Sequence, residues 1–220
     1  MATAIDYTST GEIATYVPSL SSDPSTVTPT VLGLLITRVS RQIDGLTRRR
    51  FYTSTGDETV YASGNGRARL YDLPYDLVSV TTLALAADTL KATSGTYTTI
   101  STGDYYLMPQ TPQDGWPYQW IELTNMPSAS YSTSFAYTSF PEGYNTVKII
   151  GKFGWNATGS SSVPDEIRHA ATELVIRAWR GRDMNFSDVV GVEGIGTATF
   201  SRRIPSDIQD ILDGFTRQKL

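Results

Sequence analysis

Residues 32–51 read LGLLITRVSRQIDGLTRRRF, and this stretch says more about the architecture than any other part of the 220-residue chain. Apolar side chains recur in it at helical spacing, at Leu32, Leu35, Ile36, Val39, Ile43 and Leu46. Pro29 stands just before the stripe, and proline is tolerated in a first helical turn because the N–H it lacks would have no partner there. The pattern predicts a long helix over residues 28–49 with one face in a core.

The arginines of this region stand out against an acidic chain. Thr28–Arg50 contains Arg38, Arg41, Arg48, Arg49 and Arg50 but only one acidic residue, Asp44, whereas the whole chain has a net charge of −4 and a pI of about 5.0. Arginines near a helix C-terminus complement the helix dipole and cap carbonyl groups. The alternative is that they face an acidic partner. The overall charge gives no general attraction to nucleic acid.

Three further helices are predicted outside this stretch. Ser9 followed by Glu12 fits a capping box and opens a short helix that ends before Pro18. Pro164 opens a second long helix ending near Gly181, and Pro205 opens a terminal helix. The apolar face of the second long helix is expected to contain Ile167, Ala170, Ala171, Leu174, Val175, Ala178 and Trp179. That of the terminal helix contains Ile208, Ile211, Leu212 and Phe215.

Between the long helices the hydrophobic period changes to that of strands. Gly64-Asn65-Gly66 between two short apolar runs predicts a β-hairpin, and residues 97–100 and 105–108 predict a second. Further strands are expected at residues 77–87, 120–123 and 146–153. The Gly- and Val-rich segment 183–200 is either mobile or strand-forming. The fold class is therefore α+β, a small helical bundle with a β-hairpin element and a β-rich, aromatic-rich region.

Aromatic residues concentrate in this β-rich region, since Tyr97–Tyr144 contains 11 of the 24 aromatic residues in the chain. Aromatic side chains pack well on pleated sheets, which explains them as core. Tyrosine and tryptophan are also typical anchors of protein interfaces. Stacking on nucleic-acid bases would need interleaved basic residues, and the stretch has no Lys or Arg.

Catalytic and metal-binding patterns are missing from the sequence. There is no cysteine, and the single histidine, His169, lies inside a predicted helix. Residues 64–69, GNGRAR, lack the third glycine of a dinucleotide fingerprint, and no phosphate-binding loop occurs. We expect neither enzyme activity, nor a cofactor, nor a metal. Met1–Ser9 lacks the character of a secretory signal, and no apolar stretch reaches the ~20 residues of a membrane span, so we expect a soluble protein made in a cytoplasm.

Four segments in order resemble the head–tail connector (adaptor) proteins of tailed bacteriophages. They are the helix 32–51 with its Ile-Asp pair and basic end running into Phe51; the glycine turn followed by Leu73-Pro74 and Val78-Ser79-Val80; Phe153-Gly154-Trp155 followed by a helix ending in 179–183, WRGRD; and 201–208, SRRIPSDI, before the terminal helix. The likeness covers nearly the whole chain. Many relatives are shorter, with a brief link where this chain has residues 88–144.

The resemblance implies a connector core of residues 1–87 and 145–220, a β-rich insertion at 88–144 and a C-terminal docking arm at about 183–220. It implies a homo-oligomeric ring, usually dodecameric, that joins the portal protein to the stopper or tail, with DNA passing through the lumen. Such a protein is assembled in the host cytoplasm and ends in the virion. Portal-facing residues would be Arg202, Arg203, Ile208, Ile211, Leu212 and Phe215, unless the terminal helix merely packs on its own domain. The alternative function is a tail or host-adhesion module that binds through the aromatic β region.

Overall fold

The computed structural model describes residues 5–17, 27–86, 97–112, 115–124, 138–155, 163–183, 189–192, 196–199 and 204–217. These residues form two compact units. The helical unit is drawn from Ala4–Arg49 and Val163–Arg217, and the β unit from Arg50–Ser162. Helices lie in one unit and an antiparallel sheet pair in the other, which confirms the α+β class.

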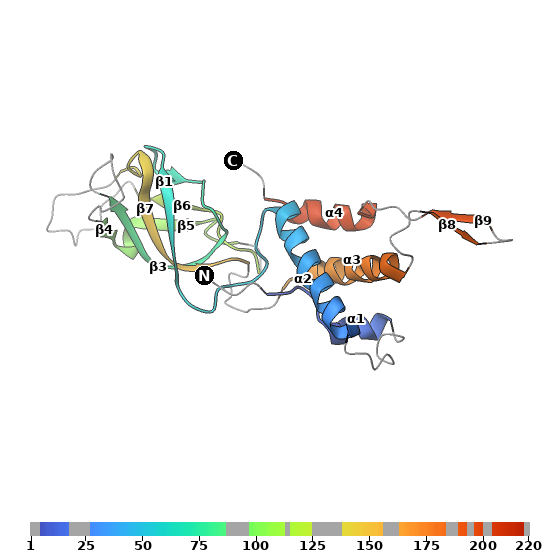
Figure 1. The fold of residues 1–220 in the computed structure, drawn as a ribbon. Coiled ribbons are helices and arrows are strands. Elements are labelled where there is room, and N and C mark those ends of the chain that lie inside the picture. The colour runs from blue at the N-terminus through green and yellow to red at the C-terminus, as the bar shows by residue number, and fades with distance from the viewer. Residues whose placement is uncertain are drawn as a thin grey trace. The chain divides into compact units, whose positions relative to one another are not determined.

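The described part of the helical unit contains four helices (Figure 1). They are α1 (Thr10–Tyr16), α2 (Val27–Thr47), α3 (Asp165–Asp183) and α4 (Ser206–Phe215). α2 packs against α3, α4 packs against both, and α1 packs against α2 and α3. The predicted cap of α1 is present, because the Ser9 side chain accepts a hydrogen bond from the Glu12 N–H. α3 ends two residues beyond Gly181.

The buried face of α2 follows most of the predicted stripe. Leu32, Ile36, Val39 and Ile43 are buried, Leu35 is partly buried, and Leu46 is 39% exposed. Leu46 lies two turns beyond Val39 on the same side of the helix, so the stripe becomes exposed only in the last turn of α2. In α3, the predicted residues Ile167, Ala170, Ala171, Val175 and Trp179 are buried, whereas Leu174 and Ala178 are only partly buried.

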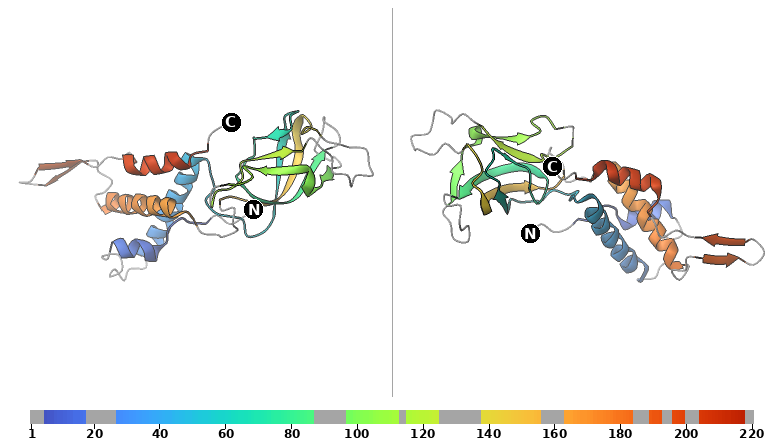
Figure 2. Two further views of the ribbon diagram at one scale, coloured as in Figure 1. Left: turned by 180° about the vertical axis from the view of Figure 1, so that it is seen from behind. Right: turned by 90° about the horizontal axis from the view of Figure 1, so that it is seen from above.

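In the residues that the structure describes, the β unit has two antiparallel sheets and one short 3-10 helix, η2 (Thr102–Asp104) (Figure 2). The strands are β1 (Glu58–Gly64), β2 (Arg69–Leu70), β3 (Leu77–Ala86), β4 (Tyr97–Ile100), β5 (Tyr105–Met108), β6 (Trp120–Leu123) and β7 (Gly143–Phe153). One sheet has the order β1-β7-β3-β4 and the other β2-β6-β5. Both sheets contribute to one core that includes Leu83, Ile149, Ile121 and Leu123.

The two hairpins predicted from turn residues were both wrong, although the turns exist. β1 pairs with β7 and β2 with β6, so the chain leaves one sheet and enters the other at Gly64–Gly66. The Asn65 side chain holds this change of direction, since it accepts from the Arg67 N–H and donates to the Arg69 carbonyl. Likewise β4 pairs with β3 and β5 with β6, across η2.

The two units divide the chain at other residues than the 88–144 boundaries. β1, β3 and all but the first two residues of β7 lie outside that stretch and β4, β5 and β6 inside it, yet all belong to the β unit. Whether 88–144 is an insertion in a shorter connector core stays a prediction. In the Gly- and Val-rich segment, the strand-forming alternative is correct. β8 (Val189–Val192) and β9 (Gly196–Thr199) form an antiparallel pair.

Candidate interaction surfaces

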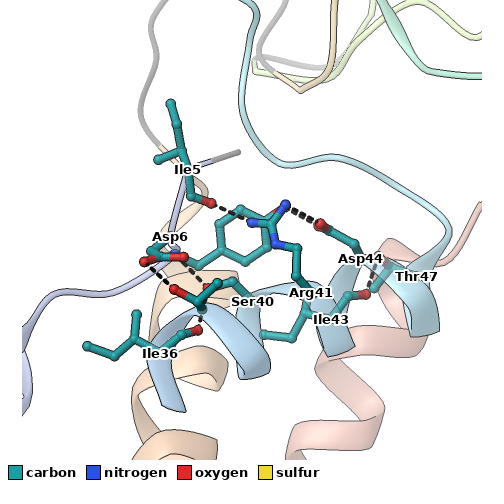
Figure 3. Close-up of polar contacts among 10 residues, drawn as sticks. Ile5, Asp6, Ile36, Ser40, Arg41, Ile43, Asp44 and Thr47 are labelled. Atoms are coloured by element: carbon teal, nitrogen blue, oxygen red, sulfur yellow. Dashed lines mark hydrogen bonds and ion pairs between the residues drawn. The ribbon is translucent and has the colours of Figure 1, made fainter. Parts of the chain in front are cut away.

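The N-terminal segment before α1 is fastened along α2 by polar contacts (Figure 3). The Arg41 guanidinium donates to the Ile5 carbonyl at 2.6 Å and pairs with Asp44 at 2.8 Å. The Tyr7 N–H donates to the Ser40 hydroxyl at 3.0 Å, and the Tyr7 hydroxyl donates to the Asp44 carboxylate. Tyr7 is only 2% exposed. The segment therefore belongs to the folded helical unit and covers one side of α2.

We expect Asp44→Ala to lower the free energy of unfolding of the helical unit by about 1–2 kcal/mol, because two hydrogen-bonded groups lose their acceptor. Asp44 accepts from both Arg41 and the buried Tyr7. Chemical unfolding followed by circular dichroism measures the change. Asp6→Ala is the matched control, since among the described residues Asp6 accepts a single hydrogen bond, from the exposed Thr37 at 3.0 Å. Equal effects of the two substitutions would contradict the assignment.

The C-terminal ends of α4 and α2 are joined by hydrogen bonds. The buried Arg49 side chain donates to the Phe215 carbonyl at 2.6 Å, and the Arg217 N–H donates to the Thr47 carbonyl at 2.9 Å. Arg49 thus satisfies a carbonyl at a helix C-terminus, which supports the capping interpretation for this one arginine. Arg50 has a different role, because it donates to the Phe153 carbonyl at 2.8 Å inside the β unit.

The residues predicted to face a portal fall into three groups. Ile208 and Leu212 are each 1% exposed and anchor α4 on its own unit. Ile211 and Phe215 are partly buried. Arg202 and Arg203 lie outside the described residues. The four described side chains do not form one open surface, because Ile208 and Leu212, four positions apart, point the same way and that side of α4 is already packed.

The outward side of α4 is acidic, a feature that our sequence reasoning missed. Asp207, Asp210 and Asp213 are all exposed, and α4 carries no Lys or Arg. The sequence indicates this acidic side by three aspartates spaced three residues apart, between which lie the apolar residues Ile208 and Leu212. Attention to the apolar positions alone selected the packed side of the helix.

Two segments behind the connector resemblance meet in the β unit. The Ser54 N–H donates to the Phe153 carbonyl at 3.2 Å, and the Thr53 hydroxyl donates to the Trp155 carbonyl at 2.5 Å. The rings of Phe51 and Trp155 lie 5.2 Å apart, and both are buried. The basic end running into Phe51 and the Phe-Gly-Trp sequence are therefore packing features that join the start of this unit to the end of β7.

The aromatic residues of the β-rich region divide between core and surface. Tyr105 and Phe140 are buried in the core, while Tyr106 and Tyr144 are 51% and 79% exposed. Tyr131, Phe135 and Tyr137 lie outside the described residues. Some of these aromatic residues therefore pack in the core, and others are exposed where they could anchor an interface.

One exposed sheet face combines tyrosines with a lysine. Tyr61 on β1 lies opposite Lys148 on β7, and the rings of Tyr61 and Tyr97 are 6.0 Å apart. Lys148 Nζ lies 5.8 Å from the centre of the Tyr97 ring. Partial burial, followed by the nearby Tyr61, raises the pKa of Tyr97 above its usual value. The hydroxyl of Tyr97 therefore stays protonated near neutral pH and donates to the Asn145 carbonyl at 2.8 Å.

The described residues do not assemble a catalytic centre around His169. Its Nε2 lies 3.7 Å from Glu173 on the same exposed side of α3, one turn apart. Within the described ranges, His, Asp and Glu nowhere form a group of three or more that could hold a metal ion. None of the described helices combines the length and the apolar character needed to cross a membrane.

A scan against protein-family models and a sequence search of curated proteins gave no match. Among solved structures, the chain is similar to one in the "Neck of empty GTA particle computed with C6 symmetry", GTA being a phage-like gene transfer agent. The identity is 12%, the TM-score is 0.50, and the match covers 94% of this chain and 90% of that one. A chain of the "Neck of native GTA particle computed with C12 symmetry" matches at 14% identity and TM-score 0.45, covering 93% and 89%. At the level of the fold, the first of these likenesses confirms the resemblance to phage neck proteins that the sequence predicted.

Proposed function

We propose that this chain is a structural subunit of the neck of a tailed phage or phage-like particle, without catalytic activity. In this role it forms a ring that joins the portal vertex to the stopper or tail and surrounds the DNA exit channel. One observation carries the proposal, namely that the fold likeness to a neck protein extends over both the helical and the β unit. The order of the four sequence segments supports it independently.

Within this proposal the partners are further copies of the chain, the portal protein and a stopper or tail-completion protein. Arg202, Arg203, Ile211 and Phe215 contact the portal, and Ile208 and Leu212 hold α4 in position for that contact. DNA is only passing cargo. The acidic net charge suits this, because a channel wall of like charge does not retain DNA. After assembly the subunit is part of the virion.

The test is mass determination and negative-stain imaging of the full chain, alone and mixed with the portal of the same particle. We expect a stoichiometric layer on the portal. Arg202→Ala combined with Arg203→Ala should weaken that binding, whereas Arg177→Ala with Arg180→Ala on α3 should not. A folded chain that ignores the portal would contradict the neck role. Deleting residues 192–220 is a poor variant, because it removes the buried anchors Ile208 and Leu212.

A second candidate function is a tail or host-adhesion module, and the exposed tyrosines favour it. Tyr61, Tyr106 and Tyr144 are 46%, 51% and 79% exposed on the β unit. Deleting residues 88–144 cannot test this, since the deletion removes β4, β5 and β6 from the core. Tyr61→Ala with Tyr144→Ala leaves the core in place. Loss of attachment to host cells with portal binding intact would support the adhesion role, and unchanged attachment would exclude these tyrosines from it.

A further inference from the structure

The side of α2 that faces away from the packed helices has a basic and apolar surface. Leu34 is 67% exposed, and Arg38 and Gln42 follow it at intervals of four residues along the same ridge. The exposed Arg48 lies just past the end of the helix. We call Leu34, Arg38, Gln42 and Arg48 the α2 ridge. Among the described residues, neither Arg38 nor Arg48 forms an ion pair.

The N-terminal segment does not cover this ridge. Its contacts run to Thr37, Ser40, Arg41 and Asp44, which lie on the neighbouring side of the helix (Figure 3). The segment therefore masks Arg41, whose charge is paired with Asp44. The positive charges of Arg38 and Arg48 stay available for another acidic surface.

An acidic surface of matching kind lies on α4, and we call Asp207, Asp210 and Asp213 the α4 acidic face. The three side chains are exposed and lie within two helical turns, about 9 Å at the ordinary rise per residue. Asp213 accepts a hydrogen bond from Gln209 at 2.7 Å, and no ion pair neutralises the face among the described residues. The buried Ile208 and Leu212 direct these aspartates outward.

The two surfaces lie on different helices of the same unit. α4 and α1 mark opposite edges of the helical unit, and α2 runs between them (Figure 1). A contact between the α2 ridge of one molecule and the α4 acidic face of another joins unlike surfaces. Such a head-to-tail contact repeats from copy to copy, and it closes into a ring when the rotation between copies allows.

We propose that the α2 ridge docks on the α4 acidic face of a second copy of this chain. Charge complementarity supports a second copy as the partner. Every copy carries both the basic α2 ridge and the α4 acidic face, so the ridge of one copy can bind the acidic face of the next. Leu34 loses exposed apolar surface in the contact. The contact deepens the proposed neck function by naming the faces that join ring subunits, and it rests on that function only for closure into a ring.

The experiment uses the full chain in sedimentation velocity over a range of concentrations at low ionic strength. Variant A carries Arg38→Glu and Arg48→Glu, and variant B carries Asp207→Arg and Asp210→Arg. Each variant alone places like charges in contact, and we expect its self-association to weaken at least about tenfold relative to the unchanged chain. Raising the salt concentration should weaken association of the unchanged chain too, because rim charges are screened.

Mixing A and B in equal amounts is the decisive step, since each then presents to the other the charge it needs. We expect the mixture to recover association that neither variant shows alone, which only a contact between molecules can produce. The control variant carries Arg177→Glu and Arg180→Glu on the exposed side of α3 and should associate like the unchanged chain. Thermal unfolding checks that every variant is folded.

The outcomes separate this contact from the neck role. Failure of the mixture to associate, or equal association of A, B and the unchanged chain, overturns the contact. A chain that is monomeric at every concentration yet coats the portal also overturns it and leaves the neck role standing. Charge-dependent association of a chain that ignores the portal supports the contact and contradicts the neck role.

Discussion

Replacing Gly154 by alanine is expected to lower the free energy of unfolding of the β unit by about 3 kcal/mol, combining backbone strain with a steric clash. Gly154 has φ of +126°, a conformation that residues with a side chain rarely adopt. A Cβ at this position would meet the Tyr52 carbonyl oxygen. The Gly154 N–H donates to the Asp76 carbonyl at 2.8 Å, so the backbone at Gly154 cannot move away from Tyr52 without losing that hydrogen bond.

The measurement is chemical unfolding followed by tryptophan fluorescence, because Trp116 and Trp155 contact each other in this unit with ring centres 4.7 Å apart and ring planes tilted by 59°. Gly103→Ala is the matched control. A Cβ at Gly103 would meet nothing within 4 Å, so the same chemical change should have little effect. Comparable stabilities of the two variants would mean that the approach of Gly154 to Tyr52 is not what the position requires.

Replacing Leu212 by alanine is expected to lower the free energy of unfolding of the helical unit by about 3 kcal/mol, the usual cost of a cavity at a buried leucine. Leu212 is 1% exposed on the side of α4 that packs against α2 and α3. The Leu212 carbonyl also accepts from the Thr216 hydroxyl at 2.9 Å, but that bond does not depend on the leucine side chain.

Circular dichroism at a helical wavelength follows this unfolding, and Ile211→Ala provides the control at the next position. Ile211 is only partly buried, so its truncation should cost distinctly less. The Leu212→Ala and Ile211→Ala variants also test how α4 takes part in portal binding. If Leu212→Ala leaves stability unchanged while abolishing portal binding, Leu212 is a contact residue rather than an anchor, and α4 must leave its own unit to bind.

Helix formation was predictable to within a few residues because its signals are local. The period of apolar residues in α2, the cap at Ser9 and the prolines before α3 and α4 each act over one or two turns. The apolar pattern also identified the packed faces, although Leu46 at the end of the α2 stripe is 39% exposed. For the candidate site, the same pattern found the anchors Ile208 and Leu212 and passed over the aspartates between them.

Strand pairing was not predictable in the same way, because a turn fixes a change of direction but not the partner strand. Gly64-Asn65-Gly66 provides a tight turn in either arrangement. Whether β1 and β2 pair with one another depends on β6 and β7, which lie more than fifty residues further along the chain. The two strands lie in different sheets, yet apolar residues of both are buried in the one core that these sheets share.

The α+β class, the helices with their apolar faces, and the resemblance to neck proteins all follow from local patterns, since propensity, capping and periodicity are properties of neighbouring residues. The pairing of the strands and the exposure of particular arginines follow from the folded structure alone. Arg41 is held by Asp44 and Ile5, and Arg49 by Phe215, while Arg38 and Arg48 remain exposed. The reason is physical. Burial and ion pairing depend on residues far apart in the chain, and their positions are known only once the core has formed.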